Sequence, residues 1–227
     1  MAKTDALSHF LHLSSYFSPS ADFYAARRTF CDIIRIKNNS QTEGGIAVHI
    51  REHWNTVHRH RALVRAYCFK LGLVWQGLTH DLSKYSPVEF WRGAKYYQGF
   101  RSPNDQERME TGVSLSWRHH KGRNRHHFEY WIDYCLDPDG KVYIGGCKMP
   151  KRYVAEMFCD RIAACRVYQG NKYTDASPYD YYQKSKGHIL IHPETSALLD
   201  RWLLLLKEQG EAIAFAKVRL ELQDDNY

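Results

Sequence analysis

The sequence has no long apolar run and no apolar segment at its start. Runs such as residues 203–206 fall far short of the ~20 apolar residues that a membrane-spanning helix requires. Near the N-terminus, Ser14 and Ser15 interrupt a short apolar group, so the residues do not indicate a secretory signal. These absences predict a cytoplasmic protein with no membrane partner.

Closely spaced cysteine pairs are also absent. The 6 cysteines include no Cys-x-x-Cys pair, which argues against a zinc ribbon and against a thioredoxin-like redox site. Cys68, Cys159 and Cys165 lie within helix-like apolar patterns, where a free cysteine packs as a small hydrophobic residue. We therefore expect no framework of disulfides.

Histidine, aromatic residues and positive charge are abundant. The 227 residues include 13 His, 16 Tyr, 10 Phe and 6 Trp, and the formal net charge is +7. The length and the hydrophobic share of 44% suit one globular domain. A basic, aromatic-rich domain is compatible with nucleic acid or with an anionic substrate, but net charge informs about partners rather than about the fold.

Apolar residues recur at helical spacing from residue 46 onward, so the expected fold class is all-α. We expect an N-terminal extension over residues 1–45 and a single helical domain over residues 46–227. Its core is expected over residues 46–168, and amphipathic C-terminal helices over residues 193–222 are expected to divide at Gly210. No internal repeat is visible.

Several helix boundaries place polar residues at defined points. One apolar stripe carries His53, and the next helical piece ends in His80 and Asp81, just before a helix start at Ser86 and Pro87. A further helix is expected from residue 103 through His120, and Asn124 is a good N-cap for a helix over the following residues. Residues 141–146 suggest a short extended stretch, and Pro150 opens another helix, which carries Asp160.

His53, His120 and Asp160 each lie within an apolar stripe. A buried charge without a partner costs several kcal/mol, so Asp160 needs a cation, which a metal ion would supply. His80, Asp81 and the doublet of His126 and His127 add further imidazole and carboxylate groups, which suit ions such as zinc, iron and manganese. The alternatives are a hydrogen-bonded core histidine at position 53 and an arginine partner, Arg118 or Arg123, for Asp160.

The order of these residues resembles that of the HD-domain superfamily of metal-dependent phosphohydrolases. The resemblance covers residues 46–168 and implies an HD-domain-like helical bundle that holds one or two divalent ions, of zinc, manganese, magnesium or iron. It implies ligands to a first ion at His53, His80, Asp81 and Asp160, with His120, His126 and His127 as candidates for a second. An uncharacterised bacterial and phage family also has similar His-Asp-Leu-Ser-Lys-Tyr-Ser-Pro and Asn-x-His-His-x-Glu-x-Trp stretches, but it supplies no activity.

Two departures from the superfamily's pattern concern the ligands. Ser83 stands where many of these phosphohydrolases have glycine, a change that can alter the loop, and the interval from His120 to His126 is shorter than in the two-metal signalling phosphodiesterases. In addition, adjacent residues of a regular helix point about 100° apart, so His126 and His127 are not expected to face one ion together. Of the two, we slightly favour His127.

The resulting hypothesis is an enzyme that hydrolyses the phosphate ester of a nucleotide or another small anionic substrate. A divalent ion would activate water, and Asp81 would bridge two ions. Lys84 is expected to neutralise the phosphate, with Arg123 and Arg125 as further substrate-binding residues. Glu129 is expected to orient a ligand imidazole, or else only to cap its helix.

Two other hypotheses remain open from the sequence. Some HD-domain proteins use two irons in the same residue order to oxygenate a small organic molecule. A nonenzymatic module that binds nucleic acid would also account for the charge and for the arginine-rich residues 118–125. Many of the aromatic residues lie on apolar helix faces, however, which favours a place in the core.

Overall fold

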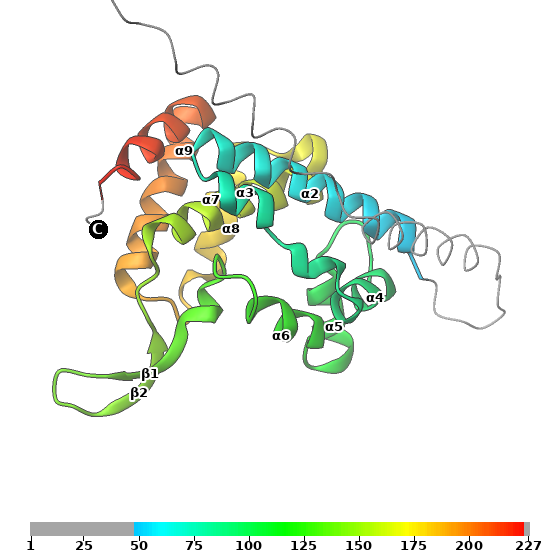
Figure 1. Ribbon diagram of the computed structural model, residues 1–227, viewed down its shortest axis with the longest axis horizontal. Coiled ribbons are helices and arrows are strands. Elements are labelled where there is room, and N and C mark those ends of the chain that lie inside the picture. Colours follow the sequence, from blue (N-terminus) through cyan, green and yellow to red (C-terminus); the bar gives the residue numbers. More distant parts are fainter. Residues whose placement is uncertain (1–47, 225–227) are drawn as a thin grey trace, which may run out of the picture. The chain divides into compact units, whose positions relative to one another are not determined.

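Helices make up most of residues 48–224, the part of the chain that this computed structural model describes (Figure 1). The expected extension over residues 1–45 lies outside the described residues. The α-helices are α2 (Ile50–Lys70), α3 (Val74–Thr79), α4 (Pro87–Lys95), α5 (Pro103–Thr111), α6 (Leu115–Lys121), α7 (Lys151–Gln169), α8 (Ser177–Lys186) and α9 (Pro193–Glu221). No helix in this part of the chain is both long and apolar enough to cross a bilayer.

Helices α2 and α7 pack against each other at the centre, and α3 folds back on α2. On the other side, α9 packs against both α7 and α8 (Figure 1). The buried face of α2 repeats at helical spacing and includes Val57, Val64 and Cys68, as the apolar stripe predicts. Helix α7 begins directly after Pro150, which also agrees with the prediction.

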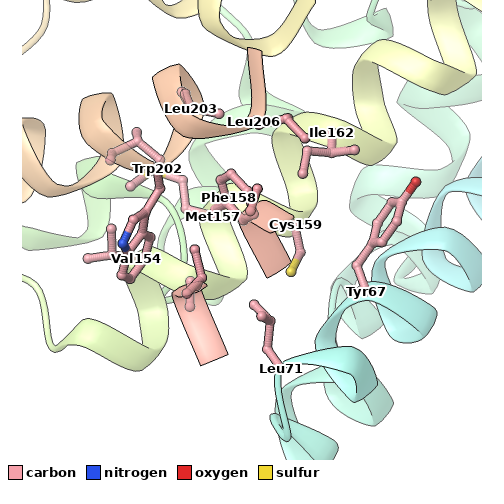
Figure 2. Close-up of a cluster of buried hydrophobic side chains, with 14 of the residues drawn as sticks. Tyr67, Leu71, Val154, Met157, Phe158, Cys159, Ile162, Trp202, Leu203 and Leu206 are labelled. Atoms are coloured by element: carbon pink, nitrogen blue, oxygen red, sulfur yellow. The ribbon is translucent and has the colours of Figure 1, made fainter. Parts of the chain in front are cut away.

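The hydrophobic core is formed mainly by α2, α7 and α9 (Figure 2). Phe158 of α7 meets Trp202 of α9, with 6.2 Å between the ring centroids, and Ile162 of α7 lies in the same cluster. Each of these side chains is fully buried. Burial of one such side chain contributes about 1.5–3 kcal/mol. Because the core residues of α7 flank Glu156 and Asp160, the packing of this helix also fixes the two carboxylates in space.

The expected helix after Asn124 does not form. The chain instead makes a 3-10 turn, η2 (Phe128–Trp131), and two antiparallel strands, β1 (Ile132–Leu136) and β2 (Val142–Gly146), which extend from the helices as a hairpin (Figure 1). Residues 137–140 read Asp-Pro-Asp-Gly, and Gly140 adopts the positive φ of 78° that such a tight turn needs. The extended stretch predicted at residues 141–146 is confirmed as β2, but the fold is mostly helical rather than purely all-α.

The helix expected from residue 103 through His120 is broken into α5 and α6. Gly112, with φ of 80°, ends α5, and the side chain of Ser114 caps α6 by accepting a hydrogen bond from the amide of Trp117 at 3.0 Å. Met109 is therefore exposed and does not share a face with the buried His120, contrary to the expectation of one continuous helix.

Helix α9 changes direction at Gly210, where φ is 79° and ψ is 170°. The predicted division of the C-terminal helices therefore lies at the expected residue. The carboxylate of Glu211, directly after the bend, pairs with Lys70 of α2 and Arg166 of α7. These contacts fix the second half of α9 against the two central helices.

Candidate metal centre

The His80-Asp81 pair lies at the junction between α3 and the 3-10 turn η1 (Leu82–Tyr85). Asp81 has φ of 53°, and among the described residues it is the one non-glycine residue with a positive φ. This conformation costs roughly 1–2 kcal/mol for most residues and is tolerated best by aspartate and asparagine. Backbone strain of this kind gathers at functional sites. Here it accompanies two buried side chains that meet at 3.4 Å, from His80 Nε2 to Asp81 Oδ2.

The first group of donor atoms joins this junction to the two central helices. It contains His60 of α2, His80, Asp81 and Asp160 of α7, with all donor atoms within 4.8 Å of one another. His60 Nε2 lies 2.9 Å from Asp160 Oδ1 and 3.4 Å from His80 Nε2. Ligand-to-ion distances of 2.0–2.2 Å require donor atoms about 3.0–3.5 Å apart, and the group is close to that spacing.

The second group of donor atoms uses the other oxygen of Asp81. It contains Asp81, His120, His126 and His127, again within 4.8 Å of one another. Asp81 Oδ1 lies 3.2 Å from His120 Nε2 and 3.5 Å from His126 Nε2, while His127 Nε2 is 2.9 Å from His120 Nε2. Asp81 is thus the member that both groups share.

Both members of the His126-His127 doublet face the second group because residues 124–127 form a turn instead of a helix. The side chain of Asn124 anchors this turn, since Nδ2 donates to the carbonyl of His120 and to Ser83 Oγ, each at 2.8 Å. The expectation that only one of the two histidines faces the site assumed helical geometry, and it is wrong for that reason. Ser83, the departure noted in the sequence, is part of the anchor.

Two glutamates orient the rings from behind. Glu156 Oε1 lies 2.9 Å from His80 Nδ1 and 3.1 Å from His126 Nδ1, so it accepts from one ring of each group. Glu89 Oε2 lies 2.7 Å from His120 Nδ1. With Nδ1 engaged in this way, each ring turns Nε2 toward Asp81, which is how carboxylates orient imidazole ligands of metal ions. Although Glu156 and the two rings are also close enough to hold an ion, we assign Glu156 to ring orientation.

The charges within the cluster are strongly coupled. Burial alone would raise the pKa of Asp81, but His80, Lys84 and His120 hold it well below its usual range. Burial alone would lower the pKa of His80, but the neighbouring carboxylates, Asp81 first among them, raise it well above its usual value. Burial and the charges of His126 and His120 lower the pKa of His127. The carboxylates are therefore ionised, and in the absence of another cation protons on histidine offset their charge.

The unsatisfied atoms of the cluster show that the residues fit a metal ion. Within residues 48–224, both oxygens of Asp81 and Nε2 of His126 are buried and make no hydrogen bond of good geometry. Lys84 Nζ lies 2.7 Å from Asp81 Oδ2 and offsets part of its charge. A buried carboxylate without hydrogen bonds is costly. Imidazole and carboxylate donors at this spacing can hold a divalent cation.

His53 lies outside both groups of donor atoms. His60, on the same helix, takes the ligand position that the sequence suggested for His53. The ring of His53 packs against Phe90, with 5.3 Å between ring centroids, and a Cβ added to Gly93 would lie 2.2 Å from its Nε2. Its Nδ1 is buried without a hydrogen bond in the described structure. Burial, and next the charge of Lys84, lowers the pKa of His53 to about 4. His53 is therefore a neutral core histidine between α2 and α4.

The other expected site residues divide between two places. Lys84 lies at the centre. Burial alone would lower its pKa, but Asp81 and Asp160 raise the pKa above its usual value, so the side chain stays charged. Arg123 and Arg125 instead line a cavity on the outer side of Glu156, which Lys84 does not line. Glu129 orients no histidine: its Oε2 is buried without a hydrogen bond among the described residues, and the role expected of it belongs to Glu156 and Glu89.

The sequence-based prediction missed three side chains of the centre. His60 lies at helical spacing from Val57 and Val64 on the stripe that suggested His53, so the pattern contained it. Glu156 precedes Asp160 by one helical turn and shares its face. Glu89 lies in the first turn of α4, where Ser86 caps its amide, and its carboxylate binds His119 and His120.

A comparison with protein families identified a match. The model of a family of unknown function (DUF5662) matches residues 49–204, which include every residue of the two groups. No curated protein and no solved structure matches the chain.

Proposed function

We propose that the chain, which belongs to this family of unknown function, hydrolyses phosphate esters with the help of divalent metal ions. The family supplies no activity, so the proposal rests on the buried centre. The observation that supports this most is Asp81, whose two oxygens face two separate groups of histidines. A carboxylate shared between two ions is the arrangement that the HD-domain resemblance implies, with His60 in place of His53. We assign the protein to that kind of enzyme on these grounds.

The donor sets favour zinc, manganese or iron. His60, His80, Asp81 and Asp160 would hold one ion, and Asp81 with three histidines would hold the other. Magnesium prefers oxygen ligands and keeps several waters, whereas imidazole suits the transition metals. Bound divalent ions supply Lewis acidity, which lowers the pKa of water toward 7 and polarises a phosphoryl oxygen.

The chain's own residues supply binding and orientation. Lys84 Nζ is protonated, 2.7 Å from Asp81 Oδ2, and 27% of its side chain remains exposed, so it is placed to bind an oxygen of an incoming phosphate. Glu156 and Glu89 hold the rings in the tautomer that leaves Nε2 free. A cation beside the centre favours an anionic substrate, and a phosphate ester is one.

The test is the substitution Asp81→Asn in the full-length protein. Asparagine tolerates the positive φ of position 81, so the variant removes the charge with the least change to the backbone. We expect metal content, measured by inductively coupled plasma mass spectrometry, to fall at least tenfold. Release of phosphate from nucleoside monophosphates and p-nitrophenyl phosphate should fall with it. Asp139→Asn, at the exposed turn of the hairpin, is the matched control and should change neither.

Two results would contradict the proposal. Full metal content in Asp81→Asn would exclude Asp81 as a ligand to either ion. Oxygen uptake by an iron-loaded protein that releases no phosphate would replace hydrolysis with the oxygenase reaction.

A further inference from the structure

A cavity of about 500 Å³ lies beside the metal centre, between α3, the turn before η2 and the first turns of α7. Its inner wall is formed by His80, His126 and Glu156. A volume of this size falls in the range of sites for small molecules. The cavity therefore has room for a ligand of its own.

The cavity opens on the opposite side of the imidazole rings from the metal groups. His80 and His126 direct Nδ1 to Glu156, which lines the cavity, and direct Nε2 to Asp81, which does not. Lys84 is also absent from the lining. A ligand held here does not reach the atoms that would carry out hydrolysis, so the cavity is distinct from the reaction centre.

Three guanidinium groups line the cavity, from Arg123, Arg125 and Arg152. Within residues 48–224 none of the three forms an ion pair: Arg123 donates to the carbonyl of His119 at 3.2 Å, and Arg125 to Tyr153 Oη at 3.3 Å. The one carboxylate in the lining, Glu156, is occupied by the two histidine rings. The lining thus has an excess of positive charge, and the planar fork of arginine matches the geometry of phosphate.

Aromatic and amide groups complete the lining. Trp75 stands at the rim with 74% of its surface exposed, and Tyr153 lies under Arg152, whose Cζ is 5.0 Å from the ring centroid. The amide of the half-buried Gln76 makes no side-chain hydrogen bond in the described part of the chain. A large exposed indole beside unpaired cations favours a ligand that has both a planar ring and a negative charge.

We propose that this cavity binds a small phosphorylated molecule with a planar aromatic ring, of the size of a nucleoside monophosphate, at a site separate from the metal centre. The arginines bind the phosphate, and Trp75 stacks on the ring. The closed inner wall favours a single nucleotide over a strand of nucleic acid, which needs a groove open at both ends. The proposal does not depend on hydrolysis.

The experiment is calorimetric titration of the full-length, metal-stripped protein with AMP, GMP, CMP and UMP. At least one should bind, while adenosine and inorganic phosphate alone should bind at least tenfold more weakly, because each supplies half of the contacts. Arg152→Gln should weaken binding about tenfold, and Arg51→Gln, at an exposed arginine of α2, is the matched control that should leave it unchanged. Trp75→Ala should lose affinity that Trp75→Phe retains.

The same titration in Asp81→Asn separates this site from the metal centre. Unchanged affinity is expected, because Asp81 does not line the cavity, and this result stands whether or not the protein proves to be a hydrolase. The proposal would be overturned by loss of binding in Asp81→Asn, or by equal affinity in Arg152→Gln, Trp75→Ala and the control. It would also be overturned if none of the four nucleotides bound, or if a short single-stranded oligonucleotide bound tenfold more tightly than they do.

Discussion

One carboxylate oxygen, Oε1 of Glu156, accepts a hydrogen bond from one histidine ring in each of the two groups of donor atoms. In Glu156→Gln the side chain keeps its shape but loses the negative charge that makes both imidazoles stronger ligands. We expect the affinity for divalent ions to fall about 10- to 100-fold. The measurement is competition with a chelating dye. Glu208→Gln, at an exposed position of α9, should match the unmodified protein, and equal affinity in both variants would remove Glu156 from the site.

The neutral His53 predicts a pH dependence of stability. Its pKa is about 4 in the folded protein and near 6.5 when unfolded, so between these values the unfolded state binds the proton. The contribution of neutral His53 to the free energy of unfolding is therefore fully present above pH 6.5. It is lost as the pH falls toward 4, by up to about 3 kcal/mol. His53→Gln should lose less stability over this range than the unmodified protein in urea unfolding.

The control for that prediction is His188→Gln, at an exposed position. Its stability should follow the unmodified protein from pH 7 to pH 4. If His53→Gln follows the same curve, then His53 is not held neutral by the fold.

The choice between His53 and His60 shows where reasoning from the sequence ends. The two residues lie seven positions apart, which is close to two helical turns, so both share the buried face of α2. Periodicity predicts that each is buried, but it does not tell which neighbour each one meets. His53 faces α4, whereas His60 faces α7, and that difference arises only from how the helices pack.

At the scale of elements, the bend in α9 depends on Gly210. Its φ of 79° and ψ of 170° fall in a region that is open almost only to glycine. Gly210→Ala should lower the free energy of unfolding by about 1–3 kcal/mol in a urea titration, through backbone strain, because an added Cβ meets nothing closer than 3.7 Å. Gly187→Ala, where φ is −76° and the space is open, is the matched control and should be near neutral.

The elements that the sequence predicted correctly are those with long, regular patterns. The apolar stripes of α2 and α7 are long and regular, Pro150 precedes the start of α7, and Gly210 marks the bend in α9 in the expected way. Residues 124–136 are short and carry histidines and aromatic residues that suit several conformations. There the turn held by Asn124 and the pairing of β1 with β2 decide the structure, and neither leaves a periodic signal.

At the scale of the whole molecule, bound ions should stabilise the fold. The centre connects α2, α7 and the segment that contains α6, and its buried carboxylates need a cation. An ion present at 100 times its dissociation constant contributes about 2.7 kcal/mol, which corresponds to a shift of roughly 5–10 °C in the unfolding temperature of a chain of this size. We expect a chelator to lower the midpoint of thermal unfolding by that amount.

Asp81→Asn supplies the control for the chelator experiment, since its midpoint should not move when chelator is added. Acidification should reduce the shift in midpoint that the chelator causes in the unmodified protein. His80 must lose its proton before it can bind an ion, and the carboxylates raise the pKa of His80. A midpoint that is insensitive to the chelator in both proteins would mean that the ions do not stabilise the fold.

The position of Glu156 between two rings has a consequence for how the centre fills. His80 and His126 share one acceptor atom, so ordering either ring also orders the other. If two ions bind, as proposed, the entropy lost in fixing this arrangement would be borne mainly by the first ion, and the second would enter rings already in place. This contribution would be cooperative, and at limiting metal it would shift the population away from half-filled centres, toward molecules that are either empty or complete.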